Sequence, residues 1–260
     1  MARSSRTLSG MADLPLVLLH AFPVDARMWQ PLRDGIATRH RLITPDQRGL
    51  GRSPLPDSDR EPSLDDAARD LLALLDRLEL RQVVLGGCSM GGYLTMAVLR
   101  LAPERVAGMV LIDTKATADT PEAARNRREL AQRAETEGVR GWLAEQMLPT
   151  LLSAETRRAR PDVTGTVRDL IERQQGSGVA WAARAMATRP DSTELLAGAD
   201  VPTLVVVGEQ DALTPPEAAR AMAESLPGGE LVVVPQAGHL TPLEAPATVT
   251  EAVLGWWPFG

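Results

Sequence analysis

The sequence predicts an α/β protein: a mostly parallel, open sheet with helices on both faces and a helical cap insertion. Short apolar runs bounded by turn residues alternate with helical patterns along most of the chain. Such runs are typical of strands buried on both faces, and their alternation with helices is typical of parallel sheets. Residues 117–195 break this alternation, because they contain helix signals but no clear strand. We therefore expect a core formed by residues 11–116 and 196–260, with a helical cap at 117–195.

Each expected strand is a short run rich in Leu, Val or Ile. The runs are Leu16–His20, Arg41–Pro45, Gln82–Gly86, Gly108–Asp113, Pro202–Gly208 and Glu230–Pro235. Between the second and third runs, Ser63 followed by acidic residues predicts the start of a helix. Further helices are expected at Gly92–Leu101, Glu217–Leu226 and Ala247–Trp257. The last helix ends in two tryptophans, and we expect at least one of them to pack into the core.

Helix signals in the cap are capping residues rather than long apolar patterns. Thr120 and Pro121 form a cap and a first helical position, and Gly138 is a stop signal. Ser153 and Asp162 are further candidate starts. The cap is therefore expected to contain several helices.

Composition excludes several classes of protein. The chain has 260 residues and a net charge of −6, so the acidic balance argues against nucleic acid as a partner. No apolar run approaches the ~20 residues that a membrane span needs, and no signal peptide is evident. With three histidines, one cysteine (Cys88) and no paired-cysteine motif, we expect no metal, no cofactor and a reducing, cytoplasmic location. The composition does not indicate an oligomeric state.

The strongest chemical signal is the segment Gly87-Cys88-Ser89-Met90-Gly91. It directly follows an expected strand and precedes an expected helix, which is the context that a G-x-S-x-G turn requires. A tight, strained turn raises the serine hydroxyl above the sheet edge, and the flanking glycines avoid Cβ clashes. The alternative is a glycine-rich turn without chemistry. The context favours Ser89 as a nucleophile.

A serine nucleophile needs a base, and the base needs an orienting acid. His239 follows the last expected strand, where it can reach the carboxyl edge of the sheet. Asp211 follows the preceding strand, and the order Ser, Asp, His matches the order expected for this arrangement. Asp113 is the rival acid and Glu209 a weaker one. We expect the triad Ser89, Asp211 and His239.

The developing oxyanion requires backbone N–H donors. One is expected from Met90, the residue after the nucleophile. The other is expected from Phe22, in the loop that follows the first strand. These two amides form the predicted oxyanion hole.

Five motifs in order along the chain resemble those of the α/β-hydrolase superfamily. They are His20-Ala21-Phe22-Pro23, the turn from Asp46 to Ser53, the segment around Ser89, Gly208-Glu209-Gln210-Asp211 and Gly238-His239. The pattern is most similar to the capped esterases and lactonases that include 3-oxoadipate enol-lactonases. This resemblance implies a helical cap over the site. Two departures are Ala21, where the family usually has glycine, and the segment before Leu16, which is too short for the family's usual first hairpin.

Three further residues are candidates for substrate binding. Trp142 and Trp181 lie in the expected cap and are candidates to line an apolar pocket. Lys115, just past a strand, either faces the pocket mouth and pairs with a substrate carboxylate or is a solvated hinge residue. Asp46, Arg48 and Ser53 are expected to form a structural turn.

The leading hypothesis is a cofactor-independent serine hydrolase that cleaves a small to medium carboxylic ester or lactone. One alternative is hydrolysis of an anionic lactone, as in 3-oxoadipate enol-lactonases. Others are perhydrolase or haloperoxidase-like chemistry, and a ligand-binding member of the fold without turnover.

Overall fold

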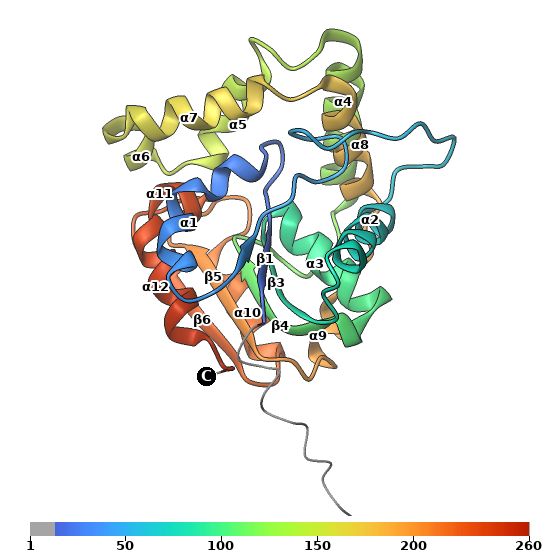
Figure 1. Ribbon diagram of the computed structural model, residues 1–260. Coiled ribbons are helices and arrows are strands. Elements are labelled where there is room, and N and C mark those ends of the chain that lie inside the picture. The colour runs from blue at the N-terminus through green and yellow to red at the C-terminus, as the bar shows by residue number, and fades with distance from the viewer. Residues whose placement is uncertain (1–13, 260) are drawn as a thin grey trace, which may run out of the picture.

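A six-stranded sheet forms the centre of the computed structural model, which describes residues 14–259 (Figure 1). All strand pairs are parallel, in the order β2-β1-β3-β4-β5-β6. The strands are β1 (Leu16–Leu19), β2 (Leu42–Ile43), β3 (Val83–Cys88), β4 (Val106–Ile112), β5 (Thr203–Gly208) and β6 (Gly229–Val234). Each overlaps its expected run, so the predicted fold class is confirmed. The expected shortening of the first hairpin concerns residues 1–13, outside the described residues.

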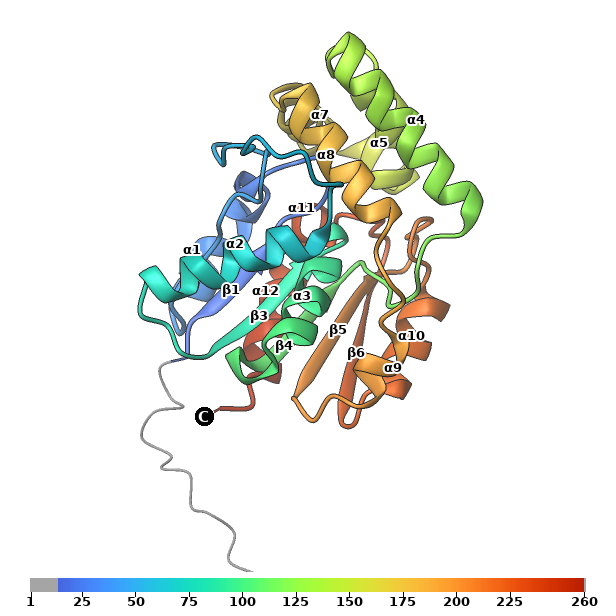
Figure 2. The ribbon, with the colours of Figure 1, turned by 90° about the vertical axis from the view of Figure 1, so that its right-hand side faces the viewer.

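Helices cover both faces of the sheet, which explains why every side chain of β1, β3 and β5 is buried (Figure 2). One face carries α1 (Gln30–Ala37) and α12 (Pro246–Trp256), which contact each other. The other carries α2 (Leu64–Arg77), α3 (Met90–Leu101), α9 (Thr193–Ala197) and α10 (Pro216–Ser225). Two single turns of 3-10 helix, η2 (Ala26–Trp29) and η3 (Pro103–Arg105), and the short α11 (Thr241–Glu244) complete the core.

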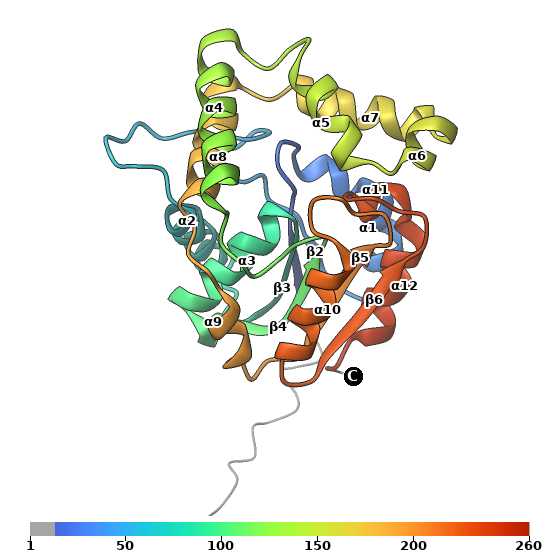
Figure 3. The same ribbon diagram turned by 180° about the vertical axis from the view of Figure 1, so that it is seen from behind.

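Five helices between β4 and β5 form a separate layer above the carboxyl edge of the sheet (Figures 1 and 3). We call them the upper helices: α4 (Pro121–Glu137), α5 (Leu143–Leu151), α6 (Ala154–Ala159), α7 (Pro161–Glu172) and α8 (Gly176–Ala187). Helices α4 and α8 pack together on one side, and α7 contacts α5 and α6 on the other. Thr120 and Ser153 cap α4 and α6 as the sequence predicts. We propose that this layer is the cap expected at residues 117–195.

Leu, Val and Ala supply most of the core, together with a few large aromatic side chains. Trp29 is fully buried, and Trp256 at the end of α12 is 7% exposed. The expectation that at least one C-terminal tryptophan packs into the core is therefore confirmed. Its neighbour Trp257 is half-buried and stacks on His40, with 3.7 Å between ring centroids.

Parallel strands bring all their carboxyl ends to the same edge of the sheet. The loops that follow β1, β3, β4, β5 and β6 therefore meet beneath the upper helices (Figure 1). Open α/β sheets bind their ligands at this edge. Within residues 14–259, none of the helices combines the length and the apolar character required to span a membrane.

Candidate active site

Ser89 occupies a strained turn between the end of β3 and the start of α3. Its backbone has φ 54° and ψ −111°, a conformation that L-residues rarely adopt. A Cβ on Gly87 would lie 2.3 Å from the carbonyl carbon of Gly91, and a Cβ on Gly91 would lie 2.0 Å from the carbonyl oxygen of Leu19. Both positions therefore require glycine, because any Cβ there would clash with backbone atoms. The turn is pressed against the end of β1 and presents the serine, which is 9% exposed.

A chain of hydrogen bonds joins Ser89, His239 and Asp211. The Oγ of Ser89 lies 2.8 Å from Nε2 of His239, and Nδ1 of His239 lies 2.8 Å from Oδ2 of Asp211. An ionised carboxylate can only accept, so Nδ1 carries the imidazole proton and Nε2 is free to accept from the serine hydroxyl. All three residues are buried. This arrangement can remove the proton of the serine as its oxygen attacks an electrophile.

The carboxylate of Asp211 is held by donors from its own loop. Its Oδ1 accepts from the backbone amides of Leu213 and Thr214, at 2.8 and 2.9 Å. Its Oδ2 accepts from the Thr214 hydroxyl at 2.6 Å as well as from His239. Burial acts to raise the pKa of Asp211, but His239 and the Thr214 donors outweigh it and the pKa is lowered. The acid is therefore kept ionised beside the imidazole.

Asp113, the rival acid, lies at the end of β4 and makes no hydrogen bond to His239. Its Oδ1 accepts from the amide of Gly208 at 3.0 Å, and its Oδ2 accepts from the amide and hydroxyl of Thr241 at 2.9 and 2.7 Å. Burial, followed by the charge of Asp211, raises the pKa of Asp113 well above its ordinary value. Asp113 thus ties together the loops that carry Asp211 and His239.

Glu209, the weaker candidate acid, and Cys88, the neighbour of Ser89, also have defined positions in the structure. Glu209 is exposed, and its Oε2 accepts from the amide of Gln236 at 2.9 Å. Cys88, directly before Ser89, is fully buried. Burial and then the neighbouring Asp113 raise the pKa of its thiol well above the usual range.

The two amides expected to form the oxyanion hole lie in adjacent loops. Phe22 follows β1 and Met90 follows Ser89, and β1 pairs with β3. As the first residue of α3, Met90 has no acceptor within its own helix. Within residues 14–259, neither the Phe22 nor the Met90 amide donates a hydrogen bond, whereas the amide of Ala21 donates to the sulfur of Met28. Two free donors are thus present at the end of the sheet.

The loop after β1 is fixed by the turn from Asp46 to Ser53. The amide of Gln47 donates to Nε2 of His20 at 2.9 Å, so Nδ1 carries the proton and donates to the carbonyl of Ala21. Burial lowers the pKa of His20, which keeps it neutral. The carboxylate of Asp46 accepts from the amides of Ala26 and Arg52, both at 2.9 Å. The expected structural role of Asp46 is confirmed.

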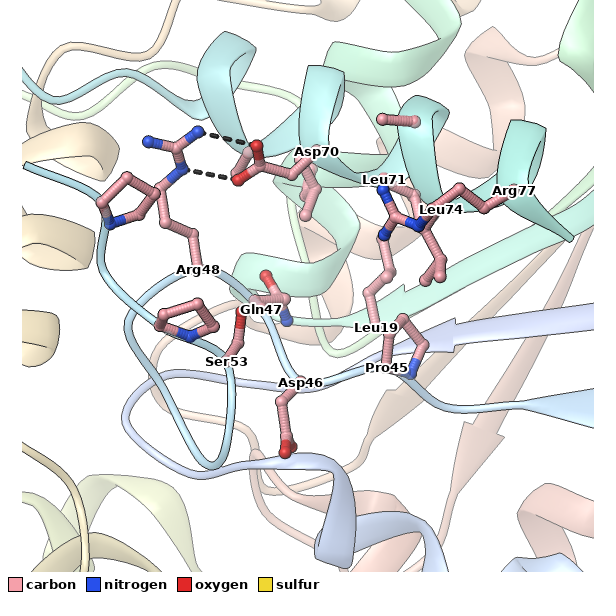
Figure 4. Close-up of a pocket in the computed structure, with 15 residues that line it drawn as sticks. Leu19, Pro45, Asp46, Gln47, Arg48, Ser53, Asp70, Leu71, Leu74 and Arg77 are labelled. Atoms are coloured by element: carbon pink, nitrogen blue, oxygen red, sulfur yellow. Dashed lines mark hydrogen bonds and ion pairs between the residues drawn. The ribbon is translucent and has the colours of Figure 1, made fainter.

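The side chain of Arg48, in the same turn, forms a bidentate ion pair with Asp70 of α2, at 2.6 and 2.7 Å (Figure 4). A cavity of about 260 Å³ lies between the turn and α2, lined by Arg48, Asp70, Leu71 and neighbouring residues. None of the residues that line it belongs to the Ser89–His239–Asp211 chain. This cavity is therefore separate from the reacting atoms.

The three candidate substrate-binding residues lie in different surroundings. Trp142 donates from Nε1 to the carbonyl of Gly138, and the Arg133 guanidinium lies 4.0 Å above its ring, so it packs within the upper helices. Trp181 of α8 faces the turn, with Arg48 5.4 Å from its ring centre. Lys115 is half-buried and follows Thr114, whose hydroxyl donates to the carbonyl of Ser89 at 2.9 Å.

Sequence reasoning missed Glu244, a buried residue of α11. Its carboxylate accepts from the amides of Gly238 and Leu240, on either side of His239, and from the amide of Ser153. A lone acidic residue in the apolar stretch Thr241–Ala245, close after the histidine, is the signal that could have found it.

The sheet, the strained serine turn and the hydrogen-bonded Ser, His and Asp define the class of α/β hydrolases. The sequence profile described as the alpha/beta hydrolase fold matches residues 15–246, and the chain belongs to this family. The prediction of a hydrolase enzyme is confirmed at this level.

Relatives extend the comparison. A thermophilic esterase from Thermogutta terrifontis, solved with malate bound, is 44% identical, with a TM-score of 0.90 over 94% of this chain and 89% of that one. The enol-lactonase from Burkholderia xenovorans LB400 is 27% identical, with a TM-score of 0.84 over 94% and 91%. The dihydrolipoyllysine-residue acetyltransferase component of the acetoin cleaving system of Pseudomonas putida is 31% identical over 96% of this chain, which spans 65% of that protein's length. The resemblance to esterases and enol-lactonases is therefore confirmed.

Proposed function

We propose that this protein is a cofactor-independent serine hydrolase of small to medium carboxylic esters or lactones. The observation that carries the proposal is the continuous hydrogen-bonded path from Ser89 through His239 to Asp211, with 2.8 Å at each step. The similarity to an esterase and an enol-lactonase supports the same class of small-molecule substrate.

In the proposed reaction, Oγ of Ser89 attacks the ester carbonyl while Nε2 of His239 takes the hydroxyl proton. The tetrahedral oxyanion accepts hydrogen bonds from the amides of Phe22 and Met90. Collapse expels the alcohol, which receives the proton from His239 and leaves an acyl-serine. His239 then removes a proton from water, the resulting hydroxide attacks the acyl carbon, and Ser89 is regenerated with release of the acid. Asp211 holds the imidazole in the required tautomer throughout.

The proposed limit on substrate size rests on how far Ser89 is enclosed. The serine is 9% exposed. We propose that a site enclosed in this way by the upper helices, with apolar contacts from them, suits short neutral acyl groups. Trp142 and Trp181 remain the proposed apolar contacts from these helices.

We expect p-nitrophenyl acetate or butyrate to be hydrolysed with a kcat/KM at least about tenfold above that for the palmitate ester. The measurement is the initial rate over a series of acyl lengths, with each ester kept below its solubility limit. Equal or higher activity on the sixteen-carbon ester would contradict the proposed size limit.

Hydrolysis of an anionic lactone is a second candidate, favoured by the surroundings of Lys115. Burial, and next the charge of Arg189, lower the pKa of Lys115. Within the described chain its ammonium group forms no ion pair, because the nearby Asp119 pairs with Arg127 and Arg189. Lys115 directly follows Thr114, which contacts the serine turn. Its half-buried ammonium group can therefore bind a substrate carboxylate.

If this candidate is right, Lys115→Ala should raise KM for an anionic enol-lactone by about tenfold or more. The same variant serves as its own control when it is assayed with neutral p-nitrophenyl butyrate, for which KM should stay unchanged. A parallel change with both substrates would remove Lys115 from anion recognition.

A further inference from the structure

The segment that carries His239 is held by hydrogen bonds from its backbone as well as by the packing of its buried side chains, among them Ala237 and Leu240. The amide of Gly238 donates to Oε1 of Glu244 at 3.0 Å, and the amide of Leu240 donates to the same oxygen at 3.3 Å. The amide of His239 itself donates to the carbonyl of Leu151 at 3.1 Å. Three successive amides are thus fixed around the imidazole.

Oε2 of the same carboxylate extends to the upper helices. It accepts from the amide of Ser153 at 2.9 Å, in the link between α5 and α6. The contact is close, because a Cβ on Gly238 would lie 2.5 Å from the Ser153 nitrogen. The His239 segment and residues 151–153 therefore form one hydrogen-bonded unit with Glu244 at its centre.

The charge of Glu244 has no cationic partner within residues 14–259. The residue is 8% exposed, and the guanidinium of Arg160 lies near its backbone carbonyl rather than its carboxylate. A buried carboxylate is costly unless hydrogen bonds compensate it. Here the compensation comes from three backbone amides, so the group acts as an anchor for the main chain and not as half of an ion pair.

We infer that Glu244 is a positioning residue for His239: its carboxylate fixes the backbone on both sides of the imidazole and joins it to residues 151–153 of the upper helices. This inference rests on the proposed role of His239 as the base. Its consequence is that the reach of Nε2 toward Ser89 depends on a side chain that never contacts the substrate.

Two substitutions separate the two halves of the contact. Glu244→Ala removes all three acceptor contacts. Glu244→Gln keeps one carbonyl oxygen as an acceptor. We expect this oxygen to face the two amides of the His239 segment, because the opposite orientation would direct the NH₂ group at both of them. The glutamine variant therefore retains the histidine anchor and loses the link to Ser153.

The test measures kcat and KM with p-nitrophenyl butyrate and the rate at which a fluorophosphonate labels Ser89. We expect Glu244→Ala to lower kcat and the labelling rate together by about 10- to 100-fold, because a base displaced by about 1 Å loses activity on this scale. Glu244→Gln should restore both to within about threefold of the wild type. The matched control is Asp119→Asn, another buried carboxyl at the junction of the core and the upper helices, whose partners are Arg127 and Arg189. Its kcat should stay within about threefold of the wild type.

A folded Glu244→Ala variant with kcat within threefold of the wild type would overturn the inference, and so would a glutamine variant as slow as the alanine one. If circular dichroism shows that Glu244→Ala does not fold, Glu244→Asp replaces it. Its shorter side chain cannot reach both segments, so a folded aspartate variant with wild-type kcat would equally overturn the inference. Wild-type protein that is neither labelled nor active would refute the proposed function instead, which keeps the two failures distinct.

Discussion

Replacement of Ser89 by alanine is expected to lower kcat for p-nitrophenyl butyrate by a factor of about 10⁴ or more, because the acyl group then has no nucleophile to receive it. The fold should survive. Alanine is no less compatible than serine with the positive φ at this position, and the one side-chain hydrogen bond of Ser89 within the described chain goes to His239. Steady-state rates and thermal melting by circular dichroism provide the measurement.

Ser53→Ala is the matched control for this experiment. Ser53 lines the cavity of Figure 4, whose lining includes none of the three triad residues, and its loss should leave kcat nearly unchanged. A Ser89→Ala variant that keeps more than a tenth of the wild-type rate would contradict the assignment of the nucleophile.

The second large effect is expected from Asp211→Asn, with a fall in kcat of about 10³- to 10⁴-fold. Every contact of this carboxylate comes from a donor: two backbone amides, the Thr214 hydroxyl and Nδ1 of His239. The NH₂ group of asparagine must face some of these donors. When it faces the histidine, Nδ1 becomes an acceptor and Nε2 takes the proton, so the imidazole can no longer accept from Ser89.

Asp113→Asn is the matched comparison, since this aspartate is also buried at the carboxyl edge of the sheet. It should lower the melting temperature, because the NH₂ group of asparagine leaves at least one of the donors to Asp113 without an acceptor, at a cost of about 1–3 kcal/mol. Its kcat should fall by less than about tenfold, because it makes no contact with the imidazole. The reverse ranking of the two variants in kcat would move the acid to β4.

Much of the fold could be predicted because its signals are local. Buried parallel strands are apolar along their whole length, so each run could be located without knowledge of its neighbours. The serine turn was equally accessible, since the glycines that permit it lie within two residues of Ser89. The motif order then placed His239 and Asp211 at the same edge of the sheet.

What the sequence left open depends on contacts between distant segments. Asp113 and Asp211 both follow strands, and only the fold shows that the donors to Asp113 come from Gly208 and Thr241. The function of Glu244 likewise depends on Ser153, which lies 91 residues away along the chain. The contact between Trp142 and Arg133, which lies nine residues earlier, likewise becomes visible only in the packing of the upper helices.

The most direct test of the central claim is peptide mapping by mass spectrometry after reaction with a fluorophosphonate. The proposed mechanism predicts one adduct per chain, on the peptide that contains Ser89. It also predicts no adduct in Ser89→Ala and strongly slowed labelling in His239→Ala, because the hydroxyl then lacks the base 2.8 Å away. An unmodified Ser89 in wild-type protein, or an adduct on a different residue, would contradict the claim that Ser89 is the activated nucleophile.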